Sequence, residues 1–276
     1  MSIYTLRKEI CEAGKRVYDR GYVASNDGNI SARVDERRVV ITPTGVSKGY
    51  MKPEDLVEVS MDGEVLSRGK KPSSEVFMHL RIYKERPDVN SVCHAHPLHA
   101  TGFAVAGIPL DMCVLPEVVI SLGSIPLVEY GTPGTEEFYM PLLGFLKDHD
   151  AFLLANHGAL TIGSDVLNAY HKMETLEHFA HIAFISKQLG QMNVLNPEQT
   201  QKLFDLRERH GITTDVRCKT CEEYGTCDVP GHDANNVNGG DQVVTCASYR
   251  ESEQPASDQK EALIQQVTQA VLKQMQ

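Results

Sequence analysis

The segment KKPSSEVFMHLRIYKERPDVNSVCHAHPLHATGFA, residues 70–104, places a helix directly before a strand. Ser73 and Ser74 are suitable caps for a helix over EVFMHLRIYKERP, and Pro87 would end it. The run NSVCHAH that follows predicts a strand. His94 and His96 stand two positions apart at the end of that run, so their side chains would point to one side of the strand.

Strands and helices continue to alternate on both sides of this segment. Helical spacing covers residues 3–22, 135–148, 166–189 and 197–210. Further strands are predicted in VVITPTG, in IPLVEY and in both halves of AFLLANHGALTIG. LVEVSMDGEVLS predicts a hairpin with its turn at Asp62-Gly63. This order of elements predicts a layered α/β fold with a mixed sheet.

Composition excludes several classes of protein. The 276 residues carry a net charge of −10 and 41% hydrophobic residues, which is typical of a globular protein. No basic patch suggests nucleic acid or an anionic membrane as a partner. The N-terminus has no apolar signal core, and no apolar run approaches a membrane span of about 20 residues. We therefore expect a cytoplasmic protein, and the odd number of cysteines, 7, favours reduced thiols over a disulfide framework.

A third histidine and a carboxylate extend the pair into a candidate metal site. His157 in ANHGAL ends an apolar strand, and Glu75 follows two serines at a helix start. Imidazole is a usual zinc ligand. Each residue also has an ordinary explanation: a polar His-x-His pair, a turn histidine, or a carboxylate favoured by helix-end electrostatics. His99 falls outside the two-residue period and is expected to be structural.

Three loops combine small hydroxyl residues with turn or helix-start amides: SNDGNIS, TPTGVS and PSSE. Such loops can bind anions through backbone N–H groups. Each loop alone could be a simple turn. Together with the histidines, the loops suggest a metal site beside a phosphate pocket.

Residues 1–211 resemble the class II aldolase/adducin family, in its L-fuculose-phosphate aldolase branch. The resemblance is carried by DGNISAR, ITPTGVS, residues 70–104 and ANHGAL. The resemblance implies a three-layer αβα domain with a central mixed or antiparallel sheet, assembled as a homotetramer with sites between subunits. It implies one Zn²⁺ per subunit, bound by His94, His96 and His157, with Glu75 as catalytic acid/base that also approaches the metal. The implied phosphate contacts are Gly28, Asn29, Thr44, Gly45, Ser73 and Ser74.

The reaction implied by the resemblance is cleavage of L-fuculose 1-phosphate or L-rhamnulose 1-phosphate to dihydroxyacetone phosphate and lactaldehyde. Sugar-phosphate 4-epimerase, dehydratase, decarboxylase and non-catalytic adducin-like roles stay as alternatives. Related epimerases usually have Asp in place of Glu75, which favours an aldolase. The family's pocket tyrosines are replaced here by Cys113 and His210, so the proton donor to the aldehyde is open. Glu117 is a substitute candidate, or a structural carboxylate.

The composition changes after residue 212. Residues 1–212 form the predicted catalytic domain, and residues 213–258, poor in large apolar side chains, form a predicted flexible linker. This linker contains His232 and four cysteines, so it could hold a structural zinc or be an oxidation-prone loop. The four cysteines are Cys218, Cys221, Cys227 and Cys246.

Residues 259–276 predict a short amphipathic helix. The helix could pack against its own domain, but the long polar linker argues against that. It resembles the peptides that target enzymes into bacterial microcompartments, which implies shell proteins as partners and the microcompartment lumen as location. The expected anchors are Leu263, Ile264, Val267, Val271 and Met275.

Overall fold

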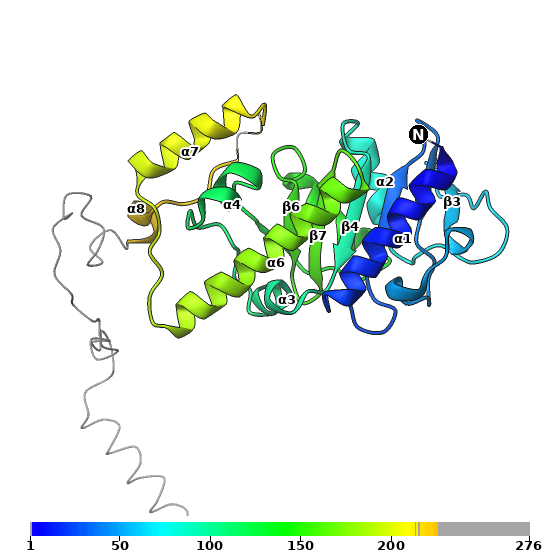
Figure 1. The fold of residues 1–276 in the computed structure, drawn as a ribbon, viewed down its shortest axis with the longest axis horizontal. Helices are drawn as coiled ribbons and strands as arrows, with labels where there is room; N and C mark the ends of the chain where they lie inside the picture. The colour runs from blue at the N-terminus through cyan, green and yellow to red at the C-terminus, as the bar shows by residue number, and fades with distance from the viewer. Residues whose placement is uncertain (1, 213, 215, 226–276) are drawn as a thin grey trace, which may run out of the picture. The chain divides into compact units, whose positions relative to one another are not determined.

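Seven strands form a single sheet in the order β3-β2-β1-β4-β7-β6-β5 (Figure 1). The computed structural model describes residues 2–212, 214 and 216–225. All neighbouring strands are antiparallel except β5 and β6, so the predicted mixed sheet is confirmed. The strands are β1 Asn29–Arg33, β2 Arg38–Ile41, β3 Val57–Ser60, β4 Ser91–Ala95, β5 Leu127–Val128, β6 Ala151–Leu154 and β7 Gly158–Gly163.

Helices cover both faces of the sheet, which gives the expected αβα arrangement. Helices α1 (Ile3–Asp19), α3 (Leu98–Val105) and α6 (Val166–Gln188) share one buried apolar cluster with the sheet, and α1 and α6 lie across its front in Figure 1. Helix α2 (Val76–Glu85), α5 (Glu136–Tyr139) and the 3₁₀ turn η3 (Pro141–Gly144) share a second cluster with the sheet.

The alternation of side chains along the strands decides which residues face α2. Cys93 and Ala95 of β4 belong to the α1–α6 cluster, whereas Val92 belongs to the α2 cluster. His94 therefore points toward the α2 layer. Asn29 of β1 pairs with His94 of β4, and its neighbours Ile30 and Ala32 pack toward α1 and α6. Asn29 and Ser31 consequently face α2 as well.

Some predicted boundaries were wrong. The helix expected over residues 135–148 is divided into α5 and η3, because Pro141 has no N–H for a helical hydrogen bond. Helix α2 begins at Val76, so Glu75 occupies the N-cap position and the two serines precede the helix. The strand expected in IPLVEY is limited to Leu127–Val128. The long helix after residue 165, the helix α7 (Pro197–Arg209) and the Asp62-Gly63 turn are confirmed.

The start of the predicted linker is part of the domain. Lys219 pairs with Met112 in an isolated parallel bridge, and helix α8 (Cys221–Tyr224) follows. Cys218 forms a disulfide with Cys113, so the prediction of a reduced thiol at Cys113 is wrong, and Cys218 is not available to a Cys-x-x-Cys metal pair. The sequence could not reveal this pairing, because 105 positions separate the two cysteines.

Two sequence-based expectations fall outside the described residues. Cys227, Cys246, His232 and the predicted helix over residues 259–276 lie there. Among the helices that are described, none combines the length and apolarity needed to cross a membrane. The remaining short elements are α4 (Pro116–Ser121), η1 (Lys48–Tyr50) and η2 (Pro53–Asp55).

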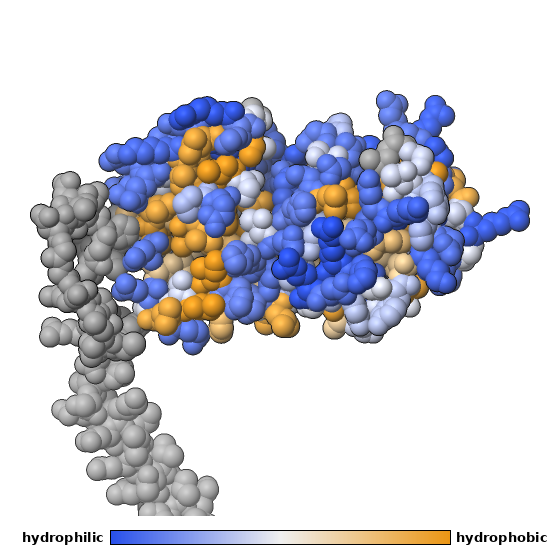
Figure 2. Space-filling model, in the orientation of Figure 1, coloured by the Kyte–Doolittle hydropathy of each residue, from blue (hydrophilic) through white to orange (hydrophobic). Residues whose placement is uncertain are grey.

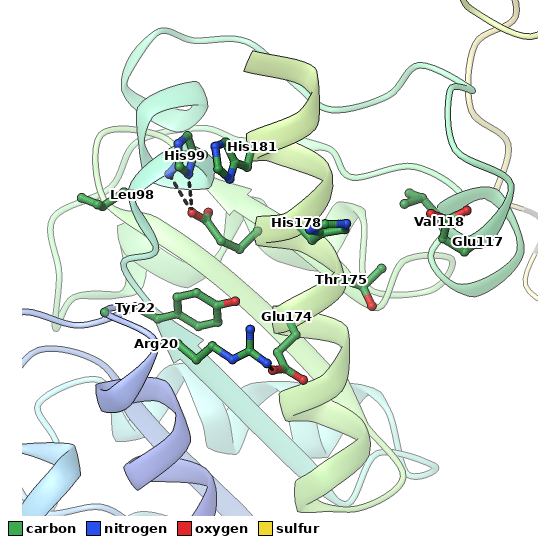
Figure 3. A pocket seen from close by; sticks show the side chains of 12 residues that line it. Arg20, Tyr22, Leu98, His99, Glu117, Val118, Glu174, Thr175, His178 and His181 are labelled. Carbon is green, nitrogen blue, oxygen red and sulfur yellow. Dashed lines mark hydrogen bonds and ion pairs between the residues drawn. The ribbon is translucent and has the colours of Figure 1, made fainter. Parts of the chain in front are cut away.

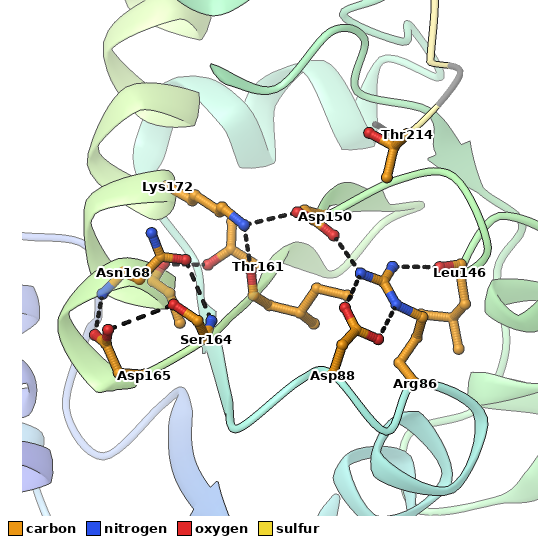
Figure 4. Close-up of polar contacts among 12 residues, drawn as sticks. Arg86, Asp88, Leu146, Asp150, Thr161, Ser164, Asp165, Asn168, Lys172 and Thr214 are labelled. Atoms are coloured by element: carbon orange, nitrogen blue, oxygen red, sulfur yellow. Dashed lines mark hydrogen bonds and ion pairs between the residues drawn. The ribbon is translucent and has the colours of Figure 1, made fainter. Parts of the chain in front are cut away.

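An ion-pair network connects α6 to the strand layer (Figure 4). Asp150, just before β6, accepts from Lys172 of α6 at 2.7 Å and from Arg86 at 3.1 Å. Arg86 also donates to Asp88 and to the Leu146 carbonyl at 2.7 Å. Asp150 thus neutralises two cations that come from different elements.

We expect Asp150→Ala to lower the free energy of unfolding by about 2 kcal/mol, because two partly buried cations lose their shared partner. Glu198→Ala is the control, because its pair with Lys202 is exposed and should contribute at most about 0.5 kcal/mol. Denaturant unfolding of both variants measures the difference. Equal losses would contradict the assigned role of Asp150.

Candidate metal and phosphate site

The residues predicted to hold metal and phosphate all line one cavity of about 190 Å³, together with Asn26, Asp27 and Pro43. They come from five places: the loop before β1 with the start of that strand, the loop after β2, the turn before α2, the end of β4, and the turn between β6 and β7. The predicted residues in the lining are Gly28, Asn29, Thr44, Gly45, Ser73, Ser74, Glu75, His94, His96 and His157.

Three imidazoles converge at the centre of this cavity. The Nε2 atom of His94 lies 3.0 Å from that of His157 and 3.1 Å from that of His96. Asn156 has a left-handed backbone (φ 56°), which turns the chain between β6 and β7 and places His157 at the cluster. Gly158 allows a close approach, since a Cβ there would lie 2.6 Å from the His96 ring.

The hydrogen bond of His94 shows that the cluster suits a cation. Its Nδ1 lies 2.8 Å from the Ala159 carbonyl, which can only accept, so Nδ1 carries the proton and Nε2 presents a lone pair. Burial lowers the pKa of His94 to about 3, so the ring is neutral. Tetrahedral zinc with bonds of about 2.0–2.1 Å would separate ligand nitrogens by about 3.3 Å, close to the observed spacing. The three histidines therefore fit a zinc ion.

Glu75 completes the cluster with a carboxylate. Its Oε1 lies 3.2 Å from His157 Nε2, and its Oε2 lies 3.3 Å from His94 Nε2. The Asn29 Nδ2 atom donates to Oε2 at 2.8 Å. Burial alone would raise the pKa of Glu75, but the hydrogen bonds from His157 and Asn29 hold it below its usual range. Glu75 is thus an ionised group beside the histidines, able to bind a cation or accept a proton.

The three loops form the other wall of the cavity. Gly28 has φ 73°, and a Cβ there would lie 2.8 Å from the His94 carbonyl, so glycine allows this loop to pack on β4. The Ser73 N–H donates to the Thr42 carbonyl and the Thr44 N–H to the Lys71 carbonyl, each at 3.1 Å, which places TPTG beside PSSE. The hydroxyl-containing loops TPTG and PSSE therefore lie side by side in the wall of the cavity that also contains the imidazoles.

Two charged residues near the cavity, Asp27 and Lys48, were not among the predicted site residues. Asp27 Oδ2 lies 3.7 Å from His96 Nδ1 and can orient that ring. Lys48 is buried, and its Nζ donates at 2.8 Å to the carbonyls of Asn26 and Val46, which joins two of the loops. Burial lowers the pKa of Lys48 to about 8. Asp27 lies inside the SNDGNIS loop but has no predicted role there, and Lys48 follows the TPTGVS loop without belonging to a motif.

The remaining predicted site residues lie elsewhere in this chain. Glu117 and His99 line a second cavity of about 530 Å³ (Figure 3). There Glu177 accepts from His99 Nδ1 at 2.7 Å and from two backbone N–H groups at the start of α3, so His99 is structural, as expected. Cys113 is fully buried in its disulfide, and His210 is the exposed C-cap of α7. Their aldehyde-pocket roles stay predictions.

This fold and this set of residues define a class of enzyme. Residues 8–184 match the Class II Aldolase and Adducin N-terminal domain. The chain therefore belongs to the class II aldolase family.

Similar proteins within this class have two different names. The chain is 36% identical over 185 residues to a 3-oxo-tetronate 4-phosphate decarboxylase of Escherichia coli O6:H1, covering 66% of this chain and 87% of that one. It is 34% identical over 175 residues to an L-fuculose phosphate aldolase of Methanococcus maripaludis, covering 63% and 93%. The crystal structure of YgbL from Klebsiella pneumoniae, a candidate aldolase/epimerase/decarboxylase, aligns with a TM-score of 0.68 and 31% identity over 74% of this chain and 99% of that one.

Proposed function

We propose that this protein is a zinc-dependent lyase that forms the enediolate of dihydroxyacetone phosphate from a larger phosphorylated substrate. The observation that supports this function best is the convergence of three imidazoles and one carboxylate in a cavity that also contains three anion-binding loops. One Zn²⁺ per subunit would be held by His94, His96 and His157.

The residues of the cavity have complementary roles in such a reaction. A bound zinc ion would supply Lewis acidity that stabilises negative charge on the substrate oxygens. The predicted phosphate contacts would hold the phosphate and fix the position of the carbonyl; they are Gly28, Asn29, Thr44, Gly45, Ser73 and Ser74. Glu75 would exchange a proton with the carbon next to that carbonyl, as a general acid/base.

Aldol cleavage is the first candidate reaction. In this reaction, the carbon–carbon bond that breaks joins the carbons of the future enediolate to the rest of L-fuculose 1-phosphate or L-rhamnulose 1-phosphate. Its cleavage releases lactaldehyde. The presence of Glu75 and the likeness to an L-fuculose phosphate aldolase support this candidate.

Decarboxylation is the second candidate, and the likeness to 3-oxo-tetronate 4-phosphate decarboxylase favours it. Loss of CO₂ from a 3-oxo acid leaves the same enediolate without an aldehyde. Such a reaction needs no proton donor for an aldehyde oxygen, in agreement with the absence of both pocket tyrosines. The cavity suits both candidates because it recognises the part of the substrate that they share.

Side-by-side assays of L-fuculose 1-phosphate, L-rhamnulose 1-phosphate, 3-oxo-tetronate 4-phosphate and ribulose 5-phosphate decide between the reactions. We expect dihydroxyacetone phosphate with either lactaldehyde or CO₂, and loss of turnover on chelation that Zn²⁺ restores. Epimerised pentulose phosphate would assign the 4-epimerase alternative. No turnover of any substrate, together with no zinc in the preparation, would support the adducin-like alternative.

We also propose that the protein assembles as a homotetramer. Apolar residues gather over α4, α7 and the C-terminal half of α6 (Figure 2), where Phe184, Ile185 and Leu189 are 45%, 44% and 73% exposed. A patch of this kind is typical of a protein interface. In such an assembly, Glu117 or His210 of one subunit could complete the site of a neighbouring subunit.

Residues 259–276 are proposed to target the enzyme to a microcompartment, with cleavage of fucose- or rhamnose-derived phosphates inside the lumen. We expect deletion of these residues to leave kcat unchanged and to abolish co-purification with shell proteins, because the apolar face of the helix would be the contact. Replacing Leu263 and Val267 by Glu in the full chain is the matched variant. Unchanged shell association in both variants would exclude targeting by this helix.

A further inference from the structure

A buried chain of hydrogen bonds leads away from Glu75 into the layer between β1 and α2. Asn29 donates to Glu75 at 2.8 Å through Nδ2, and its Oδ1 contacts His79 Nε2. His79 Nδ1 contacts the Ser31 hydroxyl at 2.6 Å, and Ser31 contacts the Tyr83 hydroxyl at 2.7 Å. All five side chains are at most 8% exposed.

The local structure explains why these residues meet. Asn29 and Ser31 are two positions apart on β1 and face α2. Glu75, His79 and Tyr83 are four positions apart along the start and body of α2, which places them on one side of the helix. Strand and helix therefore present matching rows of polar groups inside an otherwise apolar layer.

Chemistry assigns a direction to every bond in the chain. The Asn29 Nδ2 atom donates to Glu75 Oε2, and the amide oxygen Oδ1 therefore faces His79. That oxygen can only accept, so His79 carries its proton on Nε2. Burial lowers the pKa of His79 to about 4, so the ring is neutral and Nδ1 is an acceptor. Ser31 then donates to Nδ1, and Tyr83 donates to Ser31.

The direction matters because an asparagine amide can flip. A flipped Asn29 would place Oδ1 against Glu75 Oε2 and its N–H against the Nε2–H of His79, two repulsive contacts in a buried site. The imidazole therefore excludes the orientation of Asn29 that would repel the carboxylate.

We propose that His79 is a positioning residue for Glu75: its Nε2–H holds the Asn29 amide in the orientation that donates to the carboxylate. This inference rests on the proposed function for the role of Glu75, but the hydrogen-bond chain itself does not. His79 touches none of the three cluster histidines, and it reaches the phosphate loops only through the side chains of Asn29 and Ser31. Its effect should therefore appear in kcat and leave metal and phosphate binding intact.

The test compares two replacements in the full-length, zinc-loaded protein. We expect His79→Leu to lower kcat by about 10- to 100-fold, with KM and zinc affinity within about threefold of wild type. His79→Gln retains an N–H close to the Nε2 position and should restore kcat to within about threefold of wild type. In an Asn29→Ala background, His79→Leu should change kcat by less than about twofold, since the group that it positions is gone.

Tyr83→Phe is the control for general disruption of the buried layer. It removes the far hydroxyl but leaves the bonds from Ser31 to Glu75, so its kcat should stay within about threefold of wild type. Equal losses of kcat in Tyr83→Phe and His79→Leu, or additive losses with Asn29→Ala, would show a purely structural role and overturn the proposal.

An NMR measurement on the wild-type protein tests the directions of the hydrogen bonds independently of enzymatic activity. The ¹⁵N shifts of His79 should show protonated Nε2 and bare Nδ1. The opposite tautomer would refute the proposal even if both His79 variants fail to fold. Wild-type protein that shows the expected tautomer but turns over none of the four substrates would count against the proposed function alone.

Discussion

The His94→Ala variant is expected to lose bound zinc and at least about 10³-fold in kcat/KM. His94 is 1% exposed, its Nδ1 is fixed by the Ala159 carbonyl, and its Nε2 is within about 3 Å of both other imidazoles. Removing it leaves two histidines, one short of the three protein ligands usual in a catalytic zinc site. Loss of the metal removes several kcal/mol of stabilisation from the developing negative charge.

Metal analysis and kinetics on the same preparation test this expectation. His171→Ala is a matched control, because His171 is exposed on α6 and does not line the cavity. It should keep wild-type zinc content and activity. A His94→Ala protein that retains stoichiometric zinc and near-normal turnover would show that the imidazole cluster is not the metal site.

The Glu75→Gln variant is expected to retain zinc but to lose about 10²- to 10⁴-fold in kcat, the range typical of a general acid/base. Glutamine preserves the volume of the side chain and an oxygen that can accept from Asn29 Nδ2. It removes the negative charge beside His94 and His157 and the capacity to accept a proton. Chemistry should therefore fail while substrate binding persists.

Single-turnover kinetics and isotope exchange separate these effects. Exchange of the carbon-bound proton of dihydroxyacetone phosphate with solvent should be lost in Glu75→Gln. Glu177→Gln is a control, since Glu177 is a buried carboxylate that accepts backbone N–H groups at the start of α3. It should lower stability and leave proton exchange per folded molecule unchanged. Normal exchange in Glu75→Gln would assign the acid/base role to another group.

The sequence predicted the centre of the site because its residues follow simple periodicities. His94 lies on β4 and His96 follows the end of that strand two positions later, and the glycine- and hydroxyl-containing loops have recognisable composition. The cavity brings all of the predicted metal and phosphate residues together.

Other features depend on contacts that no local pattern encodes. His79 looks like an ordinary helical residue until Asn29 and Ser31 of β1 lie beside it. Lys48 is unremarkable in TPTGVSKG, yet it joins two loops from a buried position. The attachment of residues 216–225 to the domain depends on a β-bridge to residue 112 and a disulfide to residue 113, each more than 100 positions away. Polar composition alone therefore predicted a linker there.

The position of β4 in the sheet would affect how fast a metal bound at the proposed site exchanges. Three strands lie on each side of β4, and His94 is carried by this central strand. Central strands open mainly through global unfolding, whereas edges and loops open locally. Spontaneous fluctuations should release His96 and His157, which lie beyond strand ends, far more often than His94. A bound ion would then remain attached by one imidazole during brief openings and be recaptured before it diffuses away, so its residence time would exceed what three equally mobile ligands provide.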